Sequence, residues 1–455
     1  MYHLPIAFSI ILLLAFFVLS FAKPVYGLVC VIVFLPFERL GSYALNPVTG
    51  HPVIHPSDLA AISLIGAFVL LLILGKEKID RRLNPLPFII FGASVLISAI
   101  ITRGSLVWGV SFWFIFVLIL SWVTAQIVAK YGLKPLLPAI FLSAAGVSLF
   151  GIYQYLGDTA DLPASMTGIA PSYAKEVLGF TRLQSTAREP LFFANYLLTP
   201  IFLALAFVFS TKTKKLWAGA FLALMLIALF LTTSRGALLS ALTAFVLFVI
   251  YTRKTLSQKL RGNGRMLGLI SGIFVLVFAL LIGLSSLQSR GSILSGPRYV
   301  ASFFTTKLLH TGSYTDRVEN QKAAIDVFRS HPVTGVGFGG YGPYLNHDKT
   351  SPLQVNNLFF QLLAEGGLLG LISFGALWAY IFSLAHRRLL KESDQTSKLY
   401  VAGLIAAVVA ITLQSLSFSG YMCCLLHPWI SLGLLAGIAL TPVTFAQIKK
   451  ERKAK

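Results

Sequence analysis

Residues 314–374 read YTDRVENQKAAIDVFRSHPVTGVGFGGYGPYLNHDKTSPLQVNNLFFQLLAEGGLLGLISF, and they include most of the longest polar interruption in an otherwise apolar chain. Asp316 can cap the start of a helix here, because its side chain can accept hydrogen bonds from free backbone N–H groups. That helix should end at His331-Pro332, since proline lacks an amide hydrogen and disfavours helical geometry in the residue before it. After a glycine cluster the sequence becomes apolar again at Asn357. We therefore predict one large helical loop between membrane spans.

The composition of the whole chain is that of an integral membrane protein. Of its 455 residues, 56% are hydrophobic and only 12% are charged, whereas soluble domains have about 25% charged residues. The formal net charge is +21, but the basic residues form short clusters between apolar runs, as is typical of cytoplasmic loops. We therefore expect an all-α polytopic membrane protein that binds no nucleic acid.

A membrane helix needs about 20 apolar residues, and this template predicts 12 or 13 spans. The second run is short and can pair with the first as a broken hairpin, which leaves both counts open. The expected spans lie near 5–22, 24–37, 57–75, 86–101, 106–129, 135–156, 190–210, 215–232, 235–251, 266–287, 357–384, 399–418 and 423–445.

Five basic clusters predict the orientation of the last ten spans, because all five fall on one side when these spans alternate. That side should be cytoplasmic. The clusters lie at 76–82, 212–215, 253–265, 387–391 and 449–455.

The same alternation divides the chain into three regions. We expect spans with short loops over 1–287, including an outer loop near 157–189, and a large extracytoplasmic loop over 288–356. The remaining spans and a basic cytoplasmic tail should follow over 357–455.

Arg235 is the most specific single residue in the sequence. It lies in LTTSRGALLSALTAF, within a few residues of apolar sequence on both sides. A charged side chain at membrane depth costs about 3 kcal/mol or more, so such residues usually pair or face a polar cavity. Arg235 is therefore either an anion ligand in a cavity open to the outer face or an interfacial residue that reaches lipid headgroups.

Two further groups of charged residues point to an anion. Arg182, Arg188 and Glu189 precede a span whose first residue is proline, and the free N–H groups of a helix N-terminus favour negative charge. Arg317 and Arg329 of the large loop can add guanidinium groups, which bind phosphate by two parallel hydrogen bonds. The alternative for each of these residues is an ordinary solvated position.

The glycine cluster of the loop formally matches a nucleotide-binding pattern, G-x-G-x-x-G, over 337–342. A dinucleotide site needs a strand before these glycines and a helix after them within a βαβ unit, and here they follow a helix. We interpret the glycines as positions where the backbone turns tightly and approaches another surface closely.

Asn357, Gln361 and Glu365 are spaced by four residues at the start of the next span, so they share one helix face. Such a polar stripe either lines a cavity or makes hydrogen bonds between helices without taking part in chemistry.

Three motifs in this order resemble the O-antigen ligase and polymerase superfamily. They are Ser234-Arg235-Gly236, R…A…F…S-H-P…G-V-G-x-G over 317–339 and N-x-x-x-Q-x-x-x-E-G-G-x-x-G over 357–370. The resemblance covers about residues 169–440. It implies a multi-span glycosyltransferase of GT-C-like architecture in the bacterial inner membrane, which uses a sugar chain on undecaprenyl diphosphate as donor at the outer face.

The resemblance also implies roles for particular residues. Arg235 and Arg317 would hold the donor diphosphate, and Arg182 and Arg188 are further candidates for the same role.

Ligases of this family usually carry histidine followed by asparagine at the start of the span after the loop, where this chain has Asn356-Asn357. Because asparagine takes up no proton at neutral pH, we favour a polymerase of lipid-linked repeats over a ligase that transfers the glycan to lipid A-core.

The general base is then open among three residues, His347, Glu189 and Glu365. His347 is slightly favoured because the ordinary pKa of histidine, about 6.5, suits proton transfer at neutral pH. Asn356, Asn357 and Gln361 would bind and orient the acceptor.

We expect no cofactor and no metal, because no Cys/His spacing suggests a metal site and arginines can stabilise the leaving diphosphate. The expected partners are the lipid-linked donor, a glycan acceptor and membrane lipid, with a flippase or a chain-length regulator as a further candidate. Two other classes stay open, a transporter of small anions and a non-catalytic partner in envelope assembly.

Overall fold

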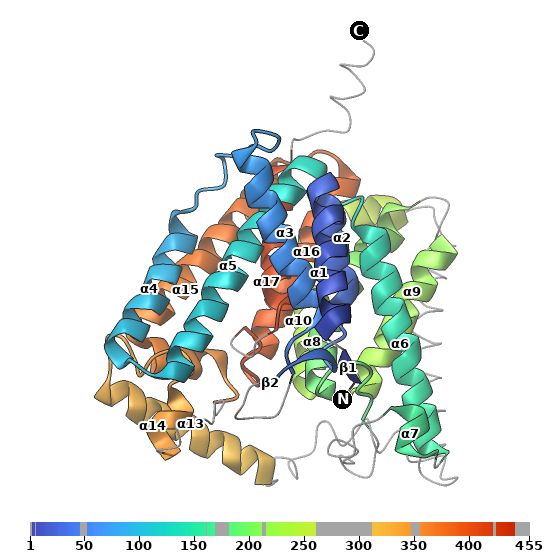
Figure 1. The fold of residues 1–455 in the computed structure, drawn as a ribbon. Coiled ribbons are helices and arrows are strands. Elements are labelled where there is room, and N and C mark those ends of the chain that lie inside the picture. The colour runs from blue at the N-terminus through green and yellow to red at the C-terminus, as the bar shows by residue number, and fades with distance from the viewer. Residues whose placement is uncertain are drawn as a thin grey trace.

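The computed structural model describes residues 2–4, 6–45, 52–160, 162–168, 182–211, 215–260, 312–346, 355–421 and 425–441. In this part the chain forms a bundle of apolar helices with a small sheet at one end (Figure 1). Within these described residues, seven helices are long and apolar enough to cross a membrane, and five further apolar helices are shorter. The all-α polytopic fold class is therefore confirmed, and the predicted span 266–287 lies outside the described residues.

The helices follow the predicted spans closely. They are α1 (Ile6–Ala22), α2 (Pro24–Phe34), α3 (Pro56–Ile73), α4 (Leu86–Thr102), α5 (Ser105–Tyr131), α6 (Leu137–Thr159), α7 (Ala164–Thr167), α8 (Pro190–Ser210), α9 (Lys215–Leu231), α10 (Arg235–Leu260), α13 (Gly312–Ser330), α14 (Tyr341–Asn346), α15 (Leu358–Lys391), α16 (Gln395–Gln414) and α17 (His427–Leu440).

Proline begins several of these helices, including α2, α3 and α8. Its fixed φ suits the first turn, where its missing N–H group would have no helical partner.

A three-stranded sheet was not expected from the sequence. It contains β1 (Tyr2–Leu4), β2 (Leu40–Leu45) and β3 (Pro52–Ile54). β2 pairs in parallel with β1 and antiparallel with β3. The strands are short and come from separate segments, so they cannot be predicted from a local alternation of apolar and polar residues.

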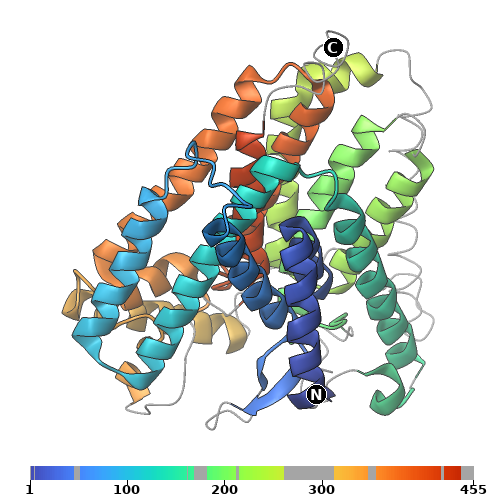
Figure 2. The same cartoon turned by 45° about the horizontal axis from the view of Figure 1, so that its top comes forward.

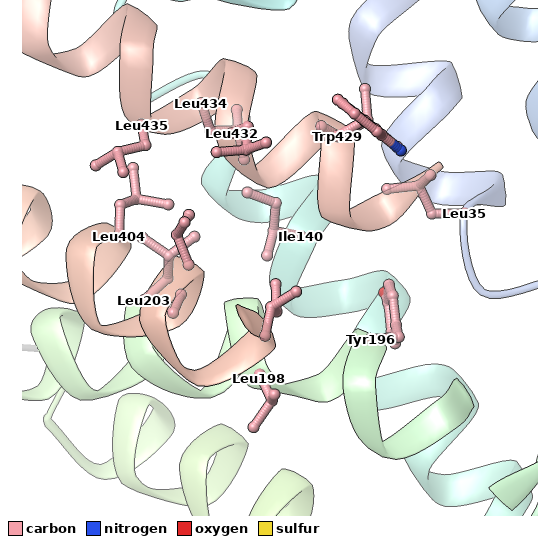
Figure 3. Close-up of a cluster of buried hydrophobic side chains, with 14 of the residues drawn as sticks. Leu35, Ile140, Tyr196, Leu198, Leu203, Leu404, Trp429, Leu432, Leu434 and Leu435 are labelled. Atoms are coloured by element: carbon pink, nitrogen blue, oxygen red, sulfur yellow. The ribbon is translucent and has the colours of Figure 1, made fainter. Parts of the chain in front are cut away.

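Helix α17 lies at the centre of the bundle. Every residue of α17 except Ala439 is buried, as expected for a helix that is apolar on all sides. Gly433 lets α17 approach α5, because a Cβ atom at this position would lie only 2.5 Å from the Ser121 carbonyl oxygen. Figure 3 shows Trp429 and the leucines of α17 among side chains from α8 and α16.

The two ends of the bundle differ in character. The sheet, α7, α13 and α14 lie at one end, here called the loop end, and α13 packs across α15 there (Figures 1 and 2). The connection after α3 carries the basic residues of 76–82, and the last turns of α15 carry those of 387–391. Both lie at the opposite end (Figure 1). This arrangement agrees with the predicted alternation, and which end faces the cytoplasm stays a prediction.

Candidate functional site

The segment 182–189 crosses the loop end and is fixed at its start to the turn between α9 and α10. The Nε atom of Arg182 donates to the carbonyl oxygen of Thr232 at 3.2 Å and to Oγ1 of Thr233 at 2.9 Å. Thr233 has φ +55°, a left-handed conformation that strains a β-branched residue. Arg235, the first residue of α10, follows directly, so this turn places Arg182 and Arg235 in the same region.

The end of the segment is fixed to the opposite side of the site by Arg188. Its backbone N–H donates to Oε2 of Glu38 at 3.1 Å, and its Nη2 atom lies 2.6 Å from Nε2 of His55. A guanidinium group can only donate, so Nε2 of His55 accepts. The Nδ1–H group of His55 then donates to the carbonyl oxygen of Leu40 at 3.1 Å, which assigns the neutral tautomer.

Burial controls the titration of this group of residues. Burial raises the pKa of Glu38 from 4.5 to about 7, although the backbone N–H and the charge of Arg188 oppose the shift. Burial also lowers the pKa of His55, although the nearby Asp58 carboxylate opposes that shift. Burial thus favours the uncharged form of both Glu38 and His55.

These side chains line a small recess at the loop end. Its empty volume of about 360 Å³ includes open solvent, and its enclosed part has room for little more than one water molecule. Charged and polar side chains form one part of its wall, and leucine side chains form another part. The lining residues are Leu35, Glu38, His55, Ser57, Asp58, Arg188, Leu425, Leu426 and His427.

Arg317 of α13 brings the large loop to the same region. Burial lowers the pKa of Arg317, and the nearby negative charge of Glu189 opposes this shift. Glu189, the N-cap residue of α8, also acts electrostatically on Glu38. The structure thus gathers Arg188, Glu189 and Arg317 beside the recess.

Asn357 stabilises the start of α15. Its Oδ1 atom accepts from the N–H of Phe359 at 3.0 Å, and its Nδ2 atom donates to the carbonyl oxygen of Leu416 at 2.9 Å. The neighbouring Ser417 packs against Gly236, next to Arg235. Asn356 and Asn357 therefore lie near the turn that carries Arg235, and their role in orienting an acceptor stays a prediction.

Gln361 and Glu365 face the large loop. Oε1 of Gln361 accepts from the N–H of Val355 at 3.2 Å. Glu365 is only 2% exposed, and its carboxyl group faces the backbone N–H groups of Gly339 and Tyr341. These contacts favour the interpretation of the stripe as hydrogen bonding between elements, and Glu365 does not line the recess.

The glycine cluster inserts into a break in α15. Gly367 interrupts this helix with φ +60°, and the N–H of Leu368 bonds instead to the carbonyl oxygen of Pro332 at 2.9 Å. At Gly335 a Cβ atom would overlap the backbone of Glu365. The interpretation of these glycines as positions of close approach is therefore confirmed.

Two predicted site residues are not placed in this region. Arg329 is exposed and pairs with Asp326 at 3.3 Å on the surface of α13. His347 lies outside the described residues.

The sequence analysis missed several polar residues of the site, namely Glu38, His55, Asp58 and His427. The available signal was a histidine followed by proline at the start of two apolar runs, at 55–56 and at 427–428. His427 also begins a buried polar chain, since its Nε2 atom lies 2.7 Å from Oδ1 of Asn195, and Asn195 donates to Gln414 at 2.8 Å. Polar residues inside apolar spans often mark functional sites.

Known proteins match part of this chain. Residues 220–375 match the family model described as O-Antigen ligase. The resemblance to the O-antigen ligase and polymerase superfamily is confirmed. The matched region includes Arg235, Arg317 and the break in α15.

A curated relative agrees with this assignment. The teichuronic acid biosynthesis protein TuaE of Bacillus subtilis (strain 168) is 26% identical over 243 residues, which are 51% of this chain and 48% of the relative. The chain thus matches about half the length of this relative. Together the two similarities support a membrane enzyme of cell-envelope polysaccharide biosynthesis.

Proposed function

We propose that this protein polymerises undecaprenyl-diphosphate-linked oligosaccharide repeats at the outer face of the bacterial inner membrane. The observation that carries the proposal is the gathering of arginines from separate elements at the loop end. Arg182 lies in the segment before α8 and is bound to the turn that precedes Arg235, Arg235 begins α10, and Arg317 belongs to α13. Arginine forms strong bidentate hydrogen bonds with phosphate oxygens, so this end of the bundle suits a diphosphate group.

The chemistry that we propose is a glycosyl transfer. A hydroxyl group of the acceptor sugar attacks the anomeric carbon of the donor, and the bond from that carbon to the diphosphate breaks. Negative charge grows on the diphosphate as it leaves, and arginines already aimed at it lower the barrier. Because arginines supply the positive charge, we propose that the reaction needs no divalent cation, so activity should persist in a chelator.

Transfer of the glycan to lipid A-core or to another acceptor is the second candidate, because the matched family model is described as a ligase. Asn356 favours the polymerase, since the usual histidine of the ligases is absent at this position. A purified reaction distinguishes the two. A polymerase lengthens the chain on undecaprenyl diphosphate, whereas a ligase moves the chain to a different acceptor.

The test uses cells that lack the chromosomal gene and carry single variants. We expect Arg235→Ala and Arg317→Ala to abolish long polymer on gels, and the lysine variants to restore it only in part because the bidentate fork is lost. Arg329→Ala is the matched control, since Arg329 is exposed and pairs with Asp326. Normal polymer in both alanine variants would refute the proposed diphosphate site.

A further inference from the structure

The carboxyl group of Glu38 lies in the recess and has no role in binding the diphosphate. Glu38 is 9% exposed and lines the recess. Its Oε2 atom is held by the backbone N–H of Arg188 at 3.1 Å. Among the described residues, no side chain or backbone group makes a hydrogen bond to its other oxygen, Oε1. One oxygen is thus fixed and the other is available to a bound molecule.

We propose that the acceptor sugar binds at the mouth of the recess with one hydroxyl group inside it, and that Glu38 takes up the proton of this attacking hydroxyl. This inference rests on the proposed glycosyl transfer. The hydroxyl oxygen forms a bond to the anomeric carbon of the donor, and the bond from that carbon to the diphosphate breaks with its electron pair. The hydroxyl proton passes to Oε1 of Glu38 and later to solvent, so the diphosphate leaves as the anion.

The charge of the recess suits a sugar better than a diphosphate. Glu38 and Asp58 both line it, whereas Arg188 contributes the guanidinium group of the lining. A diphosphate placed there would meet two carboxyl groups, but the hydroxyl groups of a neutral sugar can donate hydrogen bonds to both. The donor diphosphate is therefore better placed beside Arg317, outside the recess.

The recess also adjoins the place proposed for the donor. Glu189 acts electrostatically on Glu38 and on Arg317, so it lies near both the proposed acceptor and the proposed donor position. A proton acceptor must be within hydrogen-bond reach of the hydroxyl, and the hydroxyl must face the reacting carbon. This arrangement brings Glu38 and the diphosphate arginines to neighbouring positions, as that geometry requires.

The other titratable groups around Glu38 have different contacts. His55 accepts from Arg188 through Nε2, and Asp58 caps α3 by accepting the backbone N–H of His55 at 2.8 Å. His427 directs its Nε2 atom to Asn195. Glu189 occupies the N-cap position of α8 and lies near Arg317. The pKa of about 7 that burial gives Glu38 suits a general base at neutral pH.

The experiment uses the full-length protein in lipid nanodiscs. The probe is the lipid-diphosphate-linked repeat unit, extracted from cells in which the gene has been deleted. Initial rates of chain growth are measured from pH 5.5 to pH 9 for the parental protein, Glu38→Gln and Glu38→Asp. The matched control is Glu319→Gln, because Glu319 is an exposed carboxylate of α13 at the same end of the bundle. Thermal unfolding of each variant checks that it is folded.

The expected result is a parental rate that rises as the pH passes about 7. Glu38→Gln should lose this rise and about 10²-fold to 10³-fold in rate, Glu38→Asp should retain part of both, and Glu319→Gln should match the parent. A folded Glu38→Gln protein within twofold of the parental rate, with the same pH profile, would overturn the role of Glu38 and leave the proposed polymerase intact. A parental protein that transfers no glycan from the donor would overturn the proposed function and this inference with it.

Discussion

The Nη2 atom of Arg188 lies 2.6 Å from the Nε2 atom of His55. This contact joins the segment before α8 to the residue before α3, and it holds the arginine side chain against the wall of the recess. The backbone N–H of the same arginine holds Glu38. Arg188 is therefore a positioning residue for the recess. Loss of its side chain removes the donor to His55 and the positive charge near Glu38, whereas the backbone N–H that holds Glu38 remains.

We expect Arg188→Ala to destabilise the protein by about 1–3 kcal/mol, because it leaves the buried Nε2 atom of His55 without its donor. Chain growth should fall at least tenfold. The stability and the rate of chain growth of Arg188→Lys should lie between those of Arg188→Ala and the parental protein, since lysine keeps the charge but loses the planar fork. Thermal unfolding in detergent and the rate of chain growth are the measurements, with Arg329→Ala as the surface control. Parental stability and rate in Arg188→Ala would show that the contact is unimportant.

The packing of Gly335 against the break in α15 predicts that a side chain is not tolerated at this position. Gly335 has φ +62°, and a Cβ atom there would overlap the backbone of Glu365, so Gly335→Ala should destabilise the protein by about 2–4 kcal/mol. Gly375 lies in the same helix and has open space around it. Gly375→Ala is therefore the matched control and should be neutral or slightly stabilising.

The measurement for this pair is the melting temperature of each purified variant, together with its yield in membranes. A large drop for Gly335→Ala alone is the expected pattern. Equal melting temperatures for the two variants would contradict the close packing of the loop against α15.

The pKa of Glu38 predicts an unusual effect on stability. Its folded-state pKa of about 7 lies above the ordinary value of 4.5, so the folded protein binds this proton more tightly than the unfolded chain. The stabilisation by the bound proton is complete below pH 4.5 and is lost as the pH rises to about 7. Glu38→Gln should therefore stabilise the protein at pH 8 by roughly 1–3 kcal/mol and have little effect at pH 4.5.

The test compares melting temperatures of Glu38→Gln and the parental protein at both pH values. Glu319→Gln is the control and should show no such difference, because Glu319 is exposed. If Glu38→Gln shifts the melting temperature equally at pH 4.5 and pH 8, Glu38 does not titrate near neutral pH in the folded protein.

Apolar runs predict this fold well, because each span must satisfy its own backbone hydrogen bonds in lipid. The span predicted at 190–210 has the same bounds as α8. The helix predicted to end near 384 continues to Lys391, since Arg388 is buried and pairs with Glu392 at 2.6 Å one turn later. A template based on hydropathy alone stops at such charges although the helix does not.

The site is predicted less completely than the spans. The arginines stand out because charges are rare in apolar sequence. Glu38 and His55 do not, since their importance comes from contacts with Arg188, which is 133 residues from His55 in the chain. Contacts of this kind depend on how the helices pack, and that packing has no signature in a local pattern.

The last prediction concerns which end of the bundle faces the cytoplasm. Lys322 and Ser393 are both exposed, the first in α13 at the loop end and the second in the connection after α15 at the opposite end. The basic residues of 387–391 place that connection in the cytoplasm. In a background lacking Cys30, Cys423 and Cys424, we expect a membrane-impermeant maleimide to label Lys322→Cys in intact cells. Ser393→Cys should react only after the membrane is permeabilised, which also proves that its thiol is accessible. The reverse pattern would place the recess and its arginines on the cytoplasmic side and remove them from a donor at the outer face. Labelling of both positions in intact cells would instead show that α15 does not span the membrane.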